Sequence, residues 1–185
     1  PNLVICDIST LNTLPATVFQ DGCAEVIKYG ILFDPALFSA LSESGLGFDR
    51  EAVIARCVEL KRNVVMEDEL DTGSRMKLNL GHTIGHGVEA QSNFTITHGQ
   101  AVAIGMAIIT KARCNKIYKP IISILQKFKL PTTTDFTAKQ LFTSALSDKK
   151  RSGGTVNLIV PKRIGECVVL PTPIEELESL IEEGL

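Results

Sequence analysis

The chain has 185 residues, a mass of 20.1 kDa and a formal net charge of −2, with 44% hydrophobic and 22% charged residues. This length fits one domain, and the composition excludes intrinsic disorder or a coiled coil as the main state. No apolar stretch approaches the ~18 residues of a membrane helix, and no overall basic charge favours nucleic acid, so neither partner is expected. Five scattered cysteines without a C-x-x-C pair predict neither disulfides nor a thiolate zinc site, and they favour a cytoplasmic location.

The first residues form a short apolar run, Leu3–Cys6, which predicts a strand. The chain starts at Pro1 rather than at Met, with no signal peptide. A strand at the very start of a chain is typical of a piece of a larger protein. We therefore expect a further N-terminal domain that this sequence does not include.

Helical periodicity and capping residues dominate the rest of the chain. Pro15 starts a helix, Pro35 restarts one after Asp34, and Asp49 is placed as an N-cap. The pattern then changes to two apolar runs separated by 162–165, which predicts a β-hairpin. The expected fold is mainly α, a single helical domain with a small β-hairpin near the C-terminus and a short N-terminal strand. The expected helices span 13–32, 35–42, 49–64, 76–90, 98–116, 119–128, 137–146 and 173–183, and the hairpin strands span 155–160 and 167–170.

All three histidines of the chain, His82, His86 and His98, fall within seventeen residues. His82 and His86 are four apart on a predicted helix and share one face, and the next helix can fold back to bring His98 close. Imidazole is the commonest metal ligand in a protein without thiolate pairs, so this cluster predicts a metal site. Thr83 stands where a zinc protease of the H-E-x-x-H type needs its glutamate, which disfavours that class. The alternative is a set of structural histidines.

Glu25 lies within the otherwise apolar run 23–27 and is a candidate carboxylate ligand. The alternative interpretation is a simple ion pair with Lys28 at i+3, which the spacing alone favours.

Basic and polar residues flank the histidine segment. Convergent Lys and Arg side chains predict an anion site for phosphate or carboxylate, whereas the alternative is a solvated charged face. The sequence has neither a phosphate-binding G-x-x-x-x-G-K-[ST] loop nor a dinucleotide-binding G-x-G-x-x-G motif. The residues concerned are Lys61, Arg62, Arg75, Asn79, Lys149, Lys150 and Arg151.

Three segments together resemble the 3-dehydroquinate synthase family of sugar-phosphate cyclases. They are AEVIKYG at 24–30, the LNxGHTxGH signature at 78–86, and HGQAVAIGM at 98–106, where the family has HGEAVAIGM. The intervening stretch and the hairpin end at Ile164-Gly165-Glu166 also fit, so the resemblance covers almost the whole chain. It implies the C-terminal metal- and substrate-binding domain (residues 1–185) of a two-domain enzyme whose N-terminal NAD-binding domain is absent here.

The resemblance also implies roles for individual residues. It makes His86 a substrate-facing residue that does not bind the metal, whereas spacing alone would make it a ligand. The implied ligands of zinc (or cobalt) are Glu25, His82 and His98. The implied substrate-binding residues are Lys28, Lys61, Arg75 and Asn79. One of Lys149 and Lys150 is implied to contact phosphate.

The implied reaction is the NAD- and zinc-dependent conversion of 3-deoxy-arabino-heptulosonate 7-phosphate to 3-dehydroquinate, a carbon–oxygen lyase step of the shikimate pathway. The implied partners are the sugar phosphate, the missing domain and other copies in a homo-oligomer, and the isolated chain is expected to lack turnover. Two departures from the family pattern are Gln100 in place of Glu, which removes a charge, and Cys23 in place of a larger apolar residue. The alternatives are another sugar-phosphate cyclase, a related polyol dehydrogenase, or a non-catalytic helical interaction module.

Overall fold

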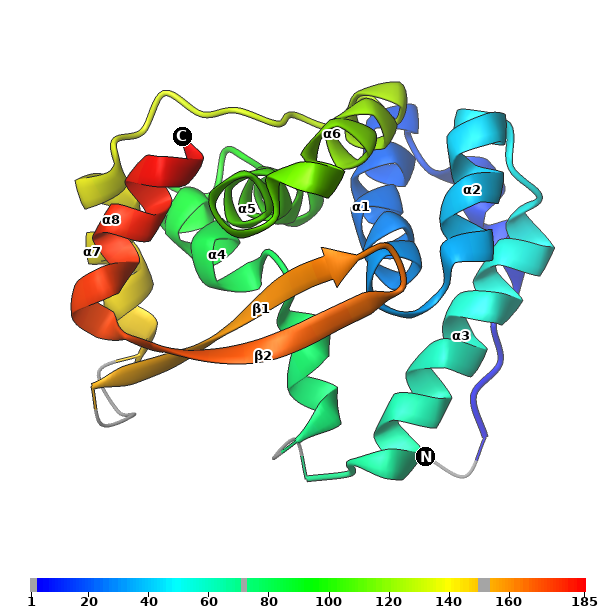
Figure 1. The fold of residues 1–185 in the computed structure, drawn as a ribbon. Helices are drawn as coiled ribbons and strands as arrows, with labels where there is room; N and C mark the ends of the chain where they lie inside the picture. Colours follow the sequence, from blue (N-terminus) through cyan, green and yellow to red (C-terminus); the bar gives the residue numbers. More distant parts are fainter. Residues whose placement is uncertain (1–2, 71–72, 150–153) are drawn as a thin grey trace.

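The computed structural model describes residues 3–70, 73–149 and 154–185, and Figure 1 shows the fold. Helices and one hairpin surround a single continuous core. The α-helices are α1 (Ala16–Phe33), α2 (Pro35–Ser44), α3 (Arg50–Glu67), α4 (His82–Gln91), α5 (His98–Arg113), α6 (Tyr118–Lys127), α7 (Ala138–Lys149) and α8 (Ile174–Gly184). Short 3-10 helices are η1 (Ile8–Thr13), η2 (Gly45–Gly47), η3 (Ser74–Asn79) and η4 (Asn115–Ile117), and the strands are β1 (Thr155–Arg163) and β2 (Glu166–Pro173).

Helix α5 forms the centre of the molecule. Every residue from Ala101 to Thr110 is buried, so this helix is apolar on all sides and must be covered on all sides. Helices α1, α4, α6 and α8 and strand β1 pack against it. In Figure 1, α1, α2 and α3 lie on one side of α5 and α7 and α8 on the other, with the hairpin below. The first turn of α5 therefore meets both α1 and α4.

The hairpin fastens α1 in place. Strands β1 and β2 are antiparallel, with Leu158 opposite Leu170 and an irregularity between Pro161 and Arg163. Gly165 at the tip has φ +84°, and its N–H donates to the carbonyl of Ile31 at 2.9 Å. A Cβ atom there would lie 2.5 Å from the Pro35 ring, so glycine allows this close docking. The C-terminal end of α1 is thereby held against the hairpin.

Most of the predicted elements are confirmed, including the Asp49 N-cap, whose carboxylate accepts from a main-chain N–H of α3. Asp34 caps α2 in the same way, with its carboxylate accepting from the N–H groups of Ala36 and Leu37. The predicted N-terminal strand is wrong: residues 3–7 have no regular structure, and Leu3, Val4 and Ile5 are 68–80% exposed. Within the described ranges the sheet contains β1 and β2 alone, so this segment has no strand beside it with which to pair.

The predicted helix over 76–90 is two elements. A break at Leu80 and Gly81 separates η3 from α4, and Gly81 adopts a left-handed φ of +79°. A continuous helix would hide His82 in its middle. The break instead makes His82 the first residue of α4.

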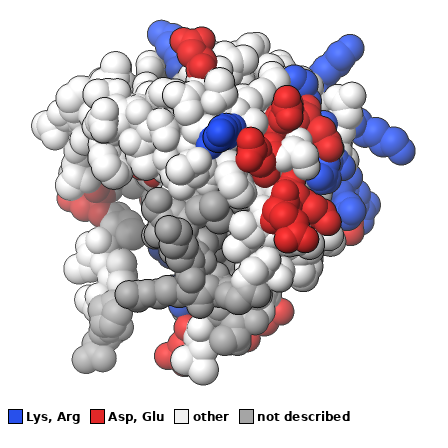
Figure 2. All heavy atoms as spheres, turned by 90° about the vertical axis from the view of Figure 1, so that its left-hand side faces the viewer, with Lys and Arg blue, Asp and Glu red and all other residues white. Residues whose placement is uncertain are grey.

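No helix in the described part of the chain combines the length and apolarity needed to cross a membrane. Figure 2 shows the side of the molecule formed by α7 and α8, where acidic side chains gather beside basic ones. Helix α8 contains five glutamates. One of them, Glu183, forms an ion pair with Arg113 at 2.5 Å.

Candidate functional site

Three side chains that are far apart in the sequence converge at the first turns of α4 and α5. Glu25 lies in the middle of α1, while His82 and His98 are the first residues of α4 and α5. One carboxylate oxygen and one nitrogen of each imidazole all lie within 4.8 Å of one another. The structure therefore brings together the three residues that the sequence resemblance marks as metal ligands.

Small residues allow this convergence. A Cβ atom on Gly105 of α5 would lie 2.0 Å from the carbonyl oxygen of Gly81, and one on Gly85 of α4 would lie 3.1 Å from that of Ala101. The pairing of 81 with 105 and of 85 with 101 means that α4 and α5 run in opposite directions in close contact. A second close approach joins α1 to α5, because a Cβ on Gly99 would lie 2.0 Å from the carbonyl of Asp21.

Both imidazoles direct Nε2 toward Glu25. The Nδ1 atom of His82 lies 3.1 Å from the carbonyl oxygen of Leu80, and that of His98 lies 3.3 Å from Glu89 Oε1. A carbonyl can only accept, so the contact with Leu80 favours a hydrogen on Nδ1 of His82 and a lone pair on its Nε2. Each Nε2 lies 3.5 Å from Glu25 Oε1.

The two oxygens of Glu25 have different surroundings. Oε2 forms an ion pair with Lys28 Nζ at 2.5 Å, and Lys28 is only 3% exposed. Oε1 is buried and has no hydrogen-bond partner among the described residues. The simple ion pair considered from the sequence is therefore present, but it accounts for only one oxygen. The other faces the Nε2 atoms of His82 and His98.

Electrostatics favour an ionised Glu25 and a neutral His82. Burial opposes ionisation of Glu25, but the charge and hydrogen bond of Lys28 and the nearby histidines outweigh it and lower its pKa. Burial and the charge of Lys28 lower the pKa of His82 to about 4, so this imidazole is neutral at pH 7. Burial also lowers the pKa of Lys28, with a smaller contribution from the charge of Lys61, while Glu25 opposes the shift.

His86 lies beside this cluster and outside the set of three converging donors. Its ring centroid is 5.7 Å from that of His82 and 6.5 Å from that of His98. The interpretation from spacing alone, with His86 as a ligand, does not match this arrangement. The position agrees with a residue that lines the site.

The other residues marked by the resemblance are less tightly grouped. Lys61 lies exposed on α3, near enough to influence Lys28. The guanidinium of Arg75 donates to the carbonyl of Glu69 at 2.9 Å. Asn79 is exposed at the end of η3, three residues before His82. Lys149 is the last residue of α7, and Lys150 lies outside the described residues, so their phosphate contact stays a prediction.

Two carboxylates that contact the first turn of α5 are not indicated by the sequence analysis. Glu89 follows His82 by seven residues, two helical turns, and that spacing on one face was the available signal. Asp21 lies one turn before Glu25, and its Oδ1 accepts from the Gln100 N–H at 2.9 Å and from the Thr97 hydroxyl. Asp21 thus fastens α1 to the first turn of α5.

Gln100 has a structural role that does not need a charge. Its Oε1 accepts from the N–H of Thr97 at 3.2 Å, completing a capping box at the start of α5. The carboxylate beside His98 is Glu89, so replacement of the usual glutamate at position 100 leaves the three converging donors intact.

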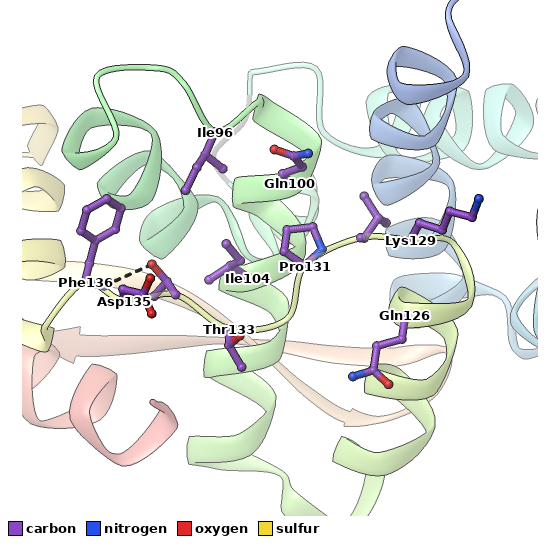
Figure 3. A pocket seen from close by; sticks show the side chains of 11 residues that line it. Ile96, Gln100, Ile104, Gln126, Lys129, Pro131, Thr133, Asp135 and Phe136 are labelled. Carbon is purple, nitrogen blue, oxygen red and sulfur yellow. Dashed lines mark hydrogen bonds between the residues drawn. The ribbon is translucent and has the colours of Figure 1, made fainter.

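A cavity of about 700 Å³ is lined in part by Gln100. Figure 3 shows it between α5, which contributes Gln100 and Ile104, and the segment of 129–136 that crosses the helix, with Phe136 at one end. Its lining is mainly apolar and includes none of the three histidines. Gln100 therefore belongs both to the lining of this cavity and to the first turn of α5.

Comparisons with known proteins place these features in context. A model of the family described as 3-dehydroquinate synthase C-terminal matches residues 22–151. Curated 3-dehydroquinate synthases from Enterococcus faecalis and Pelobacter propionicus are 36% and 38% identical over 98% and 97% of this chain and 54% of each relative. One from Pseudoalteromonas atlantica is 41% identical over 91% of this chain and 52% of the relative. The chain spans about half the length of these curated relatives.

Two solved structures share the fold. One is a 2-epi-5-epi-valiolone synthase from Streptomyces hygroscopicus subsp. jinggangensis with NAD+ and Zn2+ bound (TM-score 0.83, 22% identical, 95% of this chain and 53% of that chain). The other is a 2-deoxy-scyllo-inosose synthase complexed with carbaglucose-6-phosphate, NAD+ and Co2+ (TM-score 0.76, 20% identical, 94% and 53%).

Proposed function

The chain belongs to the 3-dehydroquinate synthase family, and from this membership we propose that it is the metal- and substrate-binding domain of such an enzyme. The proposed reaction converts 3-deoxy-arabino-heptulosonate 7-phosphate to 3-dehydroquinate with loss of phosphate. NAD is held by an N-terminal domain, and the whole enzyme works in the cytoplasm as a homo-oligomer. The identity of the curated relatives favours this substrate over those of other sugar-phosphate cyclases or polyol dehydrogenases.

One observation supports the metal site above all others. The Nε2 atoms of His82 and His98 each lie 3.5 Å from Oε1 of Glu25, and this buried oxygen has no hydrogen-bond partner among the described residues. Such an arrangement is unfavourable unless a cation lies among the three atoms. Ligand atoms about 2.1 Å from a tetrahedral ion lie about 3.4 Å apart, which agrees with the distances to Glu25. Two neutral imidazoles and a carboxylate suit Zn2+ or Co2+ and leave positions open for substrate oxygens.

A bound Zn2+ or Co2+ supplies Lewis-acid polarisation of a substrate hydroxyl or ketone, and NAD carries the hydride. Glu25, His82 and His98 hold the metal. Lys28, desolvated and paired with Glu25, keeps the ligand carboxylate ionised and presents an ammonium group beside it. His86 lines the site as a residue that faces the substrate.

Basic residues around the cluster are proposed to hold the substrate's anionic groups. Lys61, Arg75 and Asn79 contact the polar and anionic groups, and Lys149 or Lys150 also contacts the phosphate. Bound phosphate should then stabilise the folded chain. The test is a melting curve with and without millimolar phosphate on the wild type and on Arg75→Ala, and equal shifts in both would contradict the anion site.

Metal binding tests the first half of the proposal. The purified chain should bind one equivalent of zinc, measured by competition with a chromophoric chelator. His82→Ala should lose this binding, whereas His86→Ala, a matched removal of a neighbouring imidazole, should retain it. A wild-type chain that binds no stoichiometric zinc would favour the alternative, a non-catalytic helical interaction module.

Phosphate release tests the second half. The 185-residue chain with zinc, NAD and the heptulosonate phosphate should release no phosphate, because the hydride step needs a nucleotide-binding domain. Adding the separately expressed N-terminal domain should restore release, and His82→Ala should abolish it again. Turnover by the chain alone would contradict the division of roles between the two domains.

A further inference from the structure

The two imidazoles of the cluster are oriented by different means. His82 is 16% exposed, and its Nδ1 partner is the main-chain carbonyl of Leu80, only two residues away, so local backbone geometry fixes this ring. The side chain of His98 is 46% exposed, and its Nδ1 faces Glu89, nine residues away on the preceding helix. The orientation of His98 therefore depends on a second side chain.

Glu89 is well placed to act on His98. Its side chain is 14% exposed, and its Oε1 lies 3.3 Å from Nδ1, the ring nitrogen that faces away from Glu25. Its own carbonyl accepts from the N–H of Phe94 and from the hydroxyl of Ser92, both at 2.9 Å. Asn93 and Phe94 have φ values of +50° and +60°, a conformation that side chains other than glycine rarely adopt. This tight turn brings the start of α5 back beside the end of α4.

The backbone and the ring of His98 are held separately. Asp21 fastens the first turn of α5 through the N–H of Gln100 and the hydroxyl of Thr97, without contacting the imidazole. Glu89 contacts the imidazole directly. Loss of Asp21 would therefore disturb the helix end, whereas loss of Glu89 would free the ring.

Tautomer selection makes this contact matter for metal binding. A neutral imidazole carries one N–H, and the isolated side chain prefers to carry it on Nε2. In that form the hydrogen of His98 would point at Glu25 and block the lone pair from a metal. A carboxylate at Nδ1 favours the opposite tautomer and keeps Nε2 free.

We propose that Glu89 is the positioning residue of His98: its carboxylate accepts the Nδ1 hydrogen and keeps the Nε2 lone pair directed at the metal position beside Glu25. The inference rests on the proposed metal site for its purpose. The hydrogen bond itself exists without a metal.

The first experiment measures the tautomers in the metal-free protein. Long-range 1H–15N spectra of the 15N-labelled chain at pH about 8.5, roughly two units above an ordinary histidine pKa, report which nitrogen of each imidazole bears hydrogen. Three histidines give a simple spectrum, and His98→Gln assigns the signals of interest. Wild-type His98 should carry its hydrogen on Nδ1, Glu89→Ala should shift it toward Nε2, and Glu89→Gln, whose amide oxygen still accepts, should retain the wild-type form.

The second experiment measures zinc affinity on the same variants. Glu89→Ala should weaken binding 10–100-fold, a typical effect of removing the partner of a ligating histidine, and Glu89→Gln should weaken it less. Glu182→Ala, which removes an exposed glutamate of α8, should bind zinc like the wild type. If Glu89→Ala does not fold, Glu89→Leu fills similar space without an acceptor and replaces it in both experiments.

The two experiments distinguish a failure of the role proposed for Glu89 from a failure of the proposed metal site. An unchanged His98 tautomer in the variant without an acceptor, or zinc affinity within twofold of the wild type, would overturn the role of Glu89 and leave it as a stabilising contact between α4 and α5. A wild-type chain that binds no zinc would overturn the proposed metal site, and the tautomer spectra would still decide whether Glu89 orients His98.

Discussion

Gly105→Ala tests the close contact of α4 and α5 on which the convergence of Glu25, His82 and His98 depends. The added Cβ would lie 2.0 Å from the carbonyl oxygen of Gly81, 2.9 Å from its carbonyl carbon and 3.0 Å from the nitrogen of Gly85. An ordinary carbon–oxygen contact is about 3.2–3.5 Å, so the helices must separate by more than 1 Å. The Gly81 carbonyl cannot easily yield, because it accepts the N–H of Gly85 at 2.8 Å and Gly81 is fixed in a left-handed conformation.

The expected cost follows from two opposing effects. Overpacking a buried contact costs about 1–3 kcal/mol, and a clash with backbone on the facing helix belongs at the upper end. Alanine regains about 1 kcal/mol through its better helix propensity. Gly105→Ala should therefore lower the free energy of unfolding by about 2 kcal/mol, which corresponds to a fall in Tm of about 4–8 °C for a chain of this size.

Gly22→Ala is the matched control within α1. Gly22 is exposed in a helix interior, and a Cβ there would meet no atom within 4 Å. The same substitution should here raise the free energy of unfolding by about 0.5–1 kcal/mol. Urea unfolding and calorimetry of the metal-free proteins measure both changes, and zinc titration shows whether separation of the helices also displaces His82. If Gly105→Ala is as stable as the wild type, α4 and α5 do not approach each other as described.

Three further outcomes are expected. Glu25→Gln should abolish the stabilisation that excess zinc gives the wild type, about 2.7 kcal/mol at 100 times the Kd, as measured by melting curves with and without the metal. Burial opposes ionisation of Asp34, but main-chain hydrogen bonds and Arg56 lower its pKa below the unfolded value, so its stabilising effect is present above the unfolded pKa and is lost as pH falls. The gap in unfolding free energy between the wild type and Asp34→Ala, about 1 kcal/mol at pH 7, should therefore narrow as the pH falls below the ordinary aspartate pKa of about 3.9. A gap that stays constant down to low pH would contradict the assignment. Burial raises the pKa of the Cys23 and Cys167 thiols to about 12, so a thiol reagent should label exposed Cys6 in the native protein and these two only after unfolding.

Local signals in the sequence account for most of the helices. The Asp49 cap, the proline at the start of α2 and the change of pattern after residue 150 each act within a few residues, and the structure confirms the elements that they predict. The run at Leu3–Cys6 shows where such signals fail. A strand requires a neighbour, and apolar character alone cannot show whether one is present.

For the candidate site, too, the sequence predicts some features, whereas others depend on the tertiary structure. The clustering of the histidines and the resemblance of three segments pointed to Glu25, His82 and His98, because residue types at fixed short spacings carry that information. The contacts around them depend on chain segments that meet only after folding. Asp21 accepts from a main-chain N–H 79 residues away, and Glu89 contacts His98 across a turn whose left-handed residues, Asn93 and Phe94, are not glycines. Long-range packing also explains why one oxygen of Glu25 pairs with Lys28 and the other faces the two imidazoles. A sequence spacing describes neighbours along one helix, whereas the direction of each lone pair depends on where three helices cross.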